Sequence, residues 1–121
     1  MIKTKIDHLA FRVSDINKSC ELFKQLGFVE VRRTTHHGGA LEMENPQQPG
    51  LILEFTTIRA DRNQVPGFDH AGINLDGEAA LQELIAAGFP EGDKPKLVPD
   101  SGRITTNWND FDGTKWQFTL N

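Results

Sequence analysis

Eight short stretches of the chain carry the apolar residues of predicted β-strands. The stretch 51–56 shows the alternation clearly, because Leu51 and Phe55 fall on one face and Glu54 on the other. Such a period of two is typical of strands that bury one face. The predicted strands span residues 6–13, 28–35, 40–45, 51–56, 68–75, 97–98, 103–108 and 115–120.

Two further stretches have apolar residues at helical spacing, one after the strand 6–13 and one after the strand 68–75. Ser14 and Asp76 are their predicted N-caps, because short polar side chains accept hydrogen bonds from the first N–H groups of a helix. Gly27 and Gly88 are predicted to end the helices in the left-handed conformation. The predicted buried positions are Ile16, Cys20, Phe23 and Leu26 in the first helix, and Leu81, Leu84 and Ile85 in the second.

The chain repeats its own pattern. The segment 6–8 (Ile-Asp-His) has a copy at 68–70 (Phe-Asp-His), and the segment 53–56 (Leu-Glu-Phe-Thr) has a copy at 116–119 (Trp-Gln-Phe-Thr). Each half runs strand, helix and three strands. We therefore predict an α+β fold in one domain. Two tandem βαβββ modules, at about 4–57 and 68–121, are joined by the polar connection 58–67 and form curved mixed sheets around a cavity, with the helices on the outer faces.

Four side chains that can bind a metal occupy equivalent positions in the two modules: His8, Glu54, His70 and Gln117. Each lies on the face of its strand opposite the bulkier apolar residues, which must cover a helix. A carboxylate in the middle of an apolar strand is costly to bury without a partner, so Glu54 needs one. If the two sheets curve towards each other, the four side chains converge in the cavity. The alternative is a wet polar pocket without metal.

Composition narrows the class of protein. The chain of 121 residues has a formal net charge of −4, which leaves no basic surface for nucleic acid. A single cysteine excludes an internal disulfide and suits a reducing compartment. No apolar run approaches the roughly 20 residues of a membrane span, and the first residues lack the apolar core of a signal peptide. We expect a cytoplasmic protein with a small-molecule partner.

The repeated motifs resemble those of the vicinal-oxygen-chelate superfamily, which includes glyoxalase I, methylmalonyl-CoA epimerase, extradiol dioxygenases and bleomycin-binding proteins. The resemblance covers essentially the whole chain and includes residues 112–118 (Asp-Gly-Thr-Lys-Trp-Gln-Phe) before and within the last strand. It implies a divalent metal held by His8, Glu54, His70 and Gln117, and a homodimer. Glyoxalase I has a glutamate where this chain has Gln117. In this chain Glu54 is the one carboxylate of the four implied ligands.

Two imidazoles and one carboxylate suit Ni, Co, Zn, Fe or Mn. Such a set leaves open positions for a substrate that chelates the metal through adjacent oxygens. We expect a glyoxalase-like lyase or isomerase in which Glu54 is the catalytic base. The alternatives are a metal-free binding protein of the bleomycin-resistance type, and an Fe(II) dioxygenase that uses His8, His70 and Glu54 as a facial triad.

Further residues are candidates for substrate contact. Arg12 and Asn74 occupy equivalent positions four residues after each histidine, and Arg103 and Trp108 could line the second module's share of the cavity. A salt bridge is the alternative role for Arg12. The histidines at 36 and 37 are expected at the tip of a Gly-rich turn.

Overall fold

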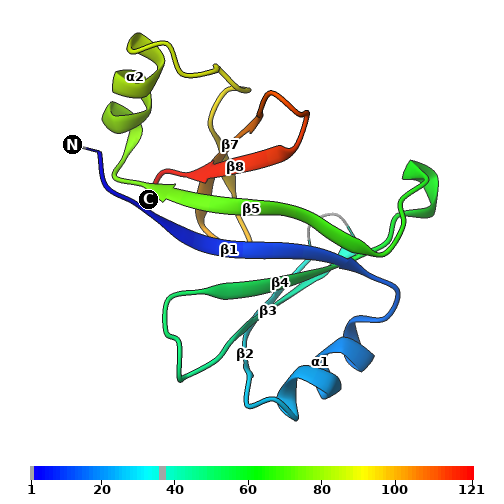
Figure 1. Ribbon diagram of the computed structural model, residues 1–121. Coiled ribbons are helices and arrows are strands. Elements are labelled where there is room, and N and C mark those ends of the chain that lie inside the picture. The colour runs from blue at the N-terminus through cyan, green and yellow to red at the C-terminus, as the bar shows by residue number, and fades with distance from the viewer. Residues whose placement is uncertain (1, 36–37) are drawn as a thin grey trace. The chain divides into compact units, whose positions relative to one another are not determined.

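The computed structural model describes residues 2–35 and 38–121, so the predicted turn at 36–37 lies outside the described residues. Its helices and strands follow one another in the order expected from the sequence (Figure 1). In chain order they are β1 (Thr4–Val13), α1 (Ile16–Lys24), β2 (Val29–Thr34), β3 (Ala40–Glu44), β4 (Ile52–Thr57), the 3₁₀ turn η2 (Ala60–Arg62), β5 (Gly67–Leu75), α2 (Glu78–Ala86), β6 (Lys96–Val98), β7 (Arg103–Asn109) and β8 (Lys115–Thr119).

Residue contacts divide the chain into two compact units. The first-half unit contains residues 8–69, and the second-half unit contains residues 1–7 and 70–121. In the first-half unit the strands lie in the order β2-β3-β4-β1, with β1 parallel to β4 and the other pairs antiparallel. The corresponding order in the second-half unit is β5-β8-β7-β6, with β5 parallel to β8.

The core of the first-half unit lies between α1 and one face of its strands. Cys20 from α1 packs with Leu41, Met43 and Phe55, and all four are buried. Phe23 adds an aromatic contact, with its ring centroid 4.9 Å from that of Phe55. Deeply buried apolar side chains of this size each stabilise a fold by about 1.5–3 kcal/mol. These contacts confirm the predicted packing of Cys20 and Phe23.

The helix ends repeat between the halves. Gly27 and Gly88 both have positive φ, 91° and 99°, as predicted. After each glycine the next N–H returns to the last turn of the helix: Phe28 N donates to Phe23 O at 3.1 Å and Phe89 N to Leu84 O at 3.0 Å. Both helices thus end with the same left-handed C-terminal motif, which strongly favours glycine.

The predicted N-caps are wrong by one residue in each helix. Asp15, not Ser14, caps α1, because its extended backbone lets its carboxylate accept from Lys18 N at 3.0 Å. Gly77, not Asp76, is the N-cap of α2, and it has no side chain to cap the helix. The α2 N-terminus has a positive φ of 89° at Gly77, a conformation that an aspartate side chain disfavours.

Three apolar residues that the sequence pattern places in the core are exposed in the structure: Leu26, Val29 and Val31. Alternation along the predicted strand 28–35 indicates that Val29 and Val31 point inward, but they are 50% and 45% exposed. They belong to β2, the outermost strand of its sheet, where a register shift between Glu30 and Arg32 interrupts the pairing with β3. Leu26 is 62% exposed because it lies beyond the last residue of α1, Lys24.

The second-half core lies between α2 and the strands of its own unit. Leu81 from α2 packs with Leu75, Phe118 and Leu120, and Ile2 from the N-terminal segment joins them. The predicted fold class, α+β with two βαβββ halves, is confirmed. Within the described parts of the chain, no helix has the length and apolar character needed to cross a membrane.

Candidate metal-binding site

His8 and Glu54 lie close together in the first-half unit. Their strands are adjacent and parallel, with Ala10 beside Glu54 and His8 beside Ile52. Both side chains are buried, His8 at 1% and Glu54 at 5% exposure. A ligand nitrogen of His8 and a carboxylate oxygen of Glu54 lie within 4.8 Å of each other. Two ligands of one zinc-sized ion are at most about 4.3 Å apart, so this spacing fits a common ion after little or no adjustment.

The second-half unit repeats this register. Gly72 of β5 lies beside Gln117 of β8, as Ala10 lies beside Glu54. His70, two residues before Gly72, is buried at 7% exposure. Gln117 is half-buried, and its Nε2 donates to Asn107 Oδ1 at 3.2 Å. His70 and Gln117 therefore hold the same places in their strands as His8 and Glu54.

A fifth side chain, Glu42, was not among the sequence-predicted site residues. It lies directly across from Glu54 in the β3–β4 pair and is 0% exposed. Directly opposite side chains of antiparallel strands share a face, with Cβ atoms about 4.5–5.5 Å apart. The alternation Leu41-Glu42-Met43 was the available signal, because it places a carboxylate on the face opposite two core residues.

Glu42 has a cationic partner. Arg32 of β2, its neighbour across the β2–β3 pair, places Nη2 3.2 Å from a Glu42 carboxylate oxygen. The guanidinium is 39% exposed, whereas the carboxylate is buried. Burying a carboxylate is costly without such compensation, and the Arg32 charge supplies it for Glu42.

The four residues considered for substrate contact have structural partners. Arg12 donates to Val65 O at 3.0 Å and pairs with the Asp69 carboxylate. Arg103 Nε donates to Asp7 Oδ2 at 3.0 Å. Asn74 Nδ2 donates to Thr119 and Asn121, and Trp108 packs against the apolar core of the second-half unit.

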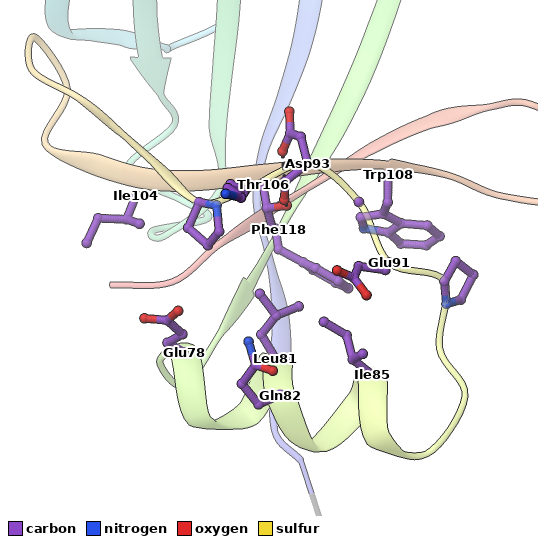
Figure 2. Close-up of a pocket in the computed structure, with 14 residues that line it drawn as sticks. Glu78, Leu81, Gln82, Ile85, Glu91, Asp93, Ile104, Thr106, Trp108 and Phe118 are labelled. Carbon is purple, nitrogen blue, oxygen red and sulfur yellow. Dashed lines mark hydrogen bonds between the residues drawn. The ribbon is translucent and has the colours of Figure 1, made fainter.

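A cavity of about 570 Å³ lies in the second-half unit, between α2 and the strands β7 and β8 (Figure 2). Leu81 and Ile85 approach it from the helix, while Trp108 and Phe118 approach it from the strands. Trp108 Nε1 is buried and has no hydrogen-bond partner within residues 2–35 and 38–121. Because side chains alternate along a strand, this cavity lies on the face of β7 and β8 opposite Asn107 and Gln117. None of the four candidate metal ligands is among the residues that line it.

Solved structures that share this fold include three at low sequence identity. Methylmalonyl-CoA epimerase from Mycobacterium tuberculosis matches with a TM-score of 0.79 and 12% identity, covering 94% of this chain and 85% of that one. A hypothetical protein from Bacillus halodurans C-125 matches with a TM-score of 0.80 and 15% identity, covering 98% and 95%. Homoprotocatechuate 2,3-dioxygenase, in an H200Q variant from B. fuscum, matches with a TM-score of 0.71 and 13% identity, covering 97% of this chain and 33% of the dioxygenase chain.

The sequence itself identifies the family. No curated protein matches it as a relative. The family model described as Glyoxalase/Bleomycin resistance protein/Dioxygenase superfamily matches residues 5–118, nearly the whole chain. The resemblance noted in the repeated motifs is therefore confirmed, and the chain belongs to the Glyoxalase/Bleomycin resistance protein/Dioxygenase superfamily.

Proposed function

We propose that this protein is a metal-dependent isomerase or lyase of the glyoxalase type. In this proposal His8, Glu54 and His70 each offer one ligand atom to a common divalent ion, and Gln117 offers its carbonyl oxygen. The observation that carries the proposal is the buried pair His8 and Glu54, repeated in register by His70 and Gln117.

The chemistry of these donors fits a catalytic rather than a closed structural ion. Two neutral imidazoles and one carboxylate balance half the charge of a divalent ion, and an amide oxygen adds a weak neutral ligand. A closed structural zinc site would instead present four strong protein ligands. When bound, the ion would polarise a substrate that chelates it through adjacent oxygens, which makes a neighbouring C–H more acidic.

Two carboxylates are candidates for the proton transfer. Glu54 is proposed to take the proton from the substrate carbon, while the electron pair of the broken C–H bond moves to the adjacent carbonyl oxygen. Return of a proton to carbon completes the isomerisation. Glu42, across the strand pair from Glu54 and balanced by Arg32, is the second carboxylate in place to give or hold a proton.

Metal content and proton exchange test this proposal together. Protein purified without chelator should contain about one Ni, Zn, Co, Mn or Fe per chain by mass spectrometry. In D₂O it should catalyse the exchange of the acidic hydrogen of a chelating substrate for deuterium, and NMR measures the loss of that C–H signal. The probes are the hemithioacetal of methylglyoxal and glutathione, and a 2-methylmalonyl thioester.

Charge-removing variants assign the roles. Glu54→Gln should lose both metal and exchange, whereas Glu42→Gln should keep the metal and lose exchange. Glu21→Gln removes an exposed carboxylate from α1 and should change neither. A protein that binds no divalent ion would refute the proposal and favour metal-free ligand binding. Bound iron with oxygen consumption on a catechol would favour the dioxygenase alternative.

A further inference from the structure

Among residues 2–35 and 38–121, the side-chain amide of Gln117 forms a hydrogen bond on one side only. Gln117 and Asn107 are directly opposite each other in the antiparallel pair of β8 and β7. Nε2 of Gln117 donates to Oδ1 of Asn107 at 3.2 Å. A carboxamide has its nitrogen and oxygen at opposite corners, so a nitrogen turned to Asn107 leaves the oxygen turned away from it.

Asn107 is an amide too, and its own orientation is set by Asp93. Asn107 Nδ2 donates to Asp93 Oδ2 at 3.2 Å, and Asn107 N donates to Asp93 Oδ1 at 2.7 Å. An ionised carboxylate only accepts hydrogen bonds, so Asn107 must turn its NH₂ group to Asp93. Its oxygen is then left for Gln117.

The three side chains therefore form a directional series: carboxylate, amide, amide. We propose that Asp93 and Asn107 are positioning residues that fix the Gln117 carboxamide with its oxygen, rather than its NH₂ group, available to the metal. This inference rests on the proposed metal-dependent function, because it gives the oxygen of Gln117 a ligand's role. Reversal of either amide would place two donors or two acceptors face to face.

The fold holds Asp93 in place for this role. Its backbone N donates to Asn107 O at 3.0 Å, which continues the edge pairing of β7 on the N-terminal side of β6, before Lys96. The hydroxyl of Thr106 donates to Asp93 Oδ1 at 3.0 Å, and Figure 2 shows the two residues side by side. Gly92 lies so close to β7 that an added Cβ would be 1.9 Å from Asn107 O. The loop thus approaches the strand as closely as its backbone allows.

The first-half unit has a matching series with other charges. There Arg32 contacts Glu42, which lies across from Glu54. In both halves the candidate ligand is opposite a polar residue on the next strand, and a charged residue beyond that strand contacts the opposite residue. A carboxylate ligand needs no fixed rotation because its two oxygens are equivalent, whereas an amide ligand does. The anion Asp93 suits an amide at position 117.

The test measures Zn²⁺ affinity by calorimetry at one pH and salt concentration. Asp93→Asn places an amide that can donate as well as accept beside Asn107, so both amides can reverse. We expect affinity to fall about 10-fold, the lower end of the effect of losing a residue that orients a metal ligand. Asp110→Asn is the matched control, because Asp110 organises a turn in the same unit through Thr114 N and Trp116 Nε1. It should change affinity less than about 2-fold.

A double-mutant comparison separates positioning from general structural damage. In a Gln117→Glu background the ligand no longer depends on rotation, so Asp93→Asn should not lower Zn²⁺ affinity. An equal loss in both backgrounds would overturn the proposal, as would unchanged affinity for Asp93→Asn in the native background. Urea unfolding of each variant shows that the protein is folded during titration.

NMR of the metal-free protein gives the second measurement. The side-chain NH₂ resonances of Gln117 are assigned by their loss in Gln117→Glu. In the native protein they should show contacts to Asn107 and slowed exchange of one proton, and Asp93→Asn should weaken both. Identical Gln117 resonances in the two proteins would overturn the inference whether or not metal binds. If the native protein does not bind Zn²⁺ but the NMR change is as expected, the metal-dependent function is refuted. The orientation of the Gln117 amide by Asp93 and Asn107 would then still stand.

Discussion

Replacing Gly92 with alanine is a severe test of how the loop before β6 meets β7. The added Cβ would be 1.9 Å from Asn107 O and 2.8 Å from Asn107 C, and both atoms belong to the backbone of a strand. Ordinary contacts are no closer than about 3.4–3.5 Å between carbon atoms, so the loop and strand must separate by more than about 1 Å. The obstacle is purely steric, because Gly92 is not among the residues with positive φ.

The magnitude follows from the hydrogen bonds that this separation breaks. The bond from Asp93 N to Asn107 O, now 3.0 Å, and the charge-assisted bond from Asn107 N to Asp93 Oδ1, now 2.7 Å, would both be lost. Together they contribute about 2–4 kcal/mol net. Alanine recovers about 0.4–1 kcal/mol by restricting the unfolded chain. We therefore expect Gly92→Ala to lower the free energy of unfolding by about 2–3 kcal/mol.

Urea unfolding followed by circular dichroism measures this free energy. Glu91→Ala is the control, because it changes the exposed neighbour in the same loop and should stay within about 0.5 kcal/mol of the native protein. A Gly92→Ala loss below about 0.5 kcal/mol, with an unchanged urea dependence, would show that the loop does not press against β7. An equal loss in both variants would show that the loop responds to any substitution.

Three further predictions address the core, the ligands and pH. Phe23→Ala should lower the free energy of unfolding by about 3 kcal/mol, whereas Leu22→Ala, at a side chain 57% exposed, should cost less than about 0.5 kcal/mol; urea denaturation compares them. Glu54→Gln should weaken Zn²⁺ binding because it removes the anionic ligand, whereas Gln117→Glu adds an anion and should tighten it. Calorimetry measures both affinities, and equal affinity of Glu54→Gln and native protein would exclude Glu54 as a ligand. Burial raises the pKa of Asp93, but the hydrogen bonds from Asn107 and Thr106 outweigh it and hold the pKa below its ordinary value. The folded state thus binds this proton less readily than the unfolded state. The ionised Asp93 carboxylate therefore stabilises the fold above about pH 4, and this stabilisation is lost as the pH falls further. The urea midpoint of Asp93→Asn should accordingly fall less between pH 5 and pH 3 than that of the native protein.

The regular parts of this fold follow from local sequence signals. Alternation located the strands to within a residue or two, since one face of each sheet must exclude water. The helix ends followed from Gly27 and Gly88, because few residues other than glycine adopt the left-handed conformation there. The two copies of the histidine motif then placed His8 and His70 at equivalent positions without knowledge of any contact.

The missed features depend on pairing between distant strands. Glu42 became a candidate only once β3 was placed in register with Glu54, and sequence alone does not set that register. Asp93 lies in a loop without periodicity, and its partners Thr106 and Asn107 are 13 and 14 residues away. Val29 was predicted to point inward because alternation shows that a strand has an apolar face, but not that the strand is outermost in its sheet.

Both tryptophans of the chain belong to the second-half unit, and there is no tyrosine. Trp108 and Trp116 stack with ring centroids 5.9 Å apart and an interplanar angle of 16°. Tryptophan fluorescence therefore reports on residues 70–121, and the first-half unit has no tryptophan of its own. Because phenylalanine contributes little to emission above 300 nm, the protein has a built-in optical reporter for one half. Unfolding curves by fluorescence and by far-ultraviolet circular dichroism would coincide if the halves melt as one cooperative unit, and would separate if either half melts first.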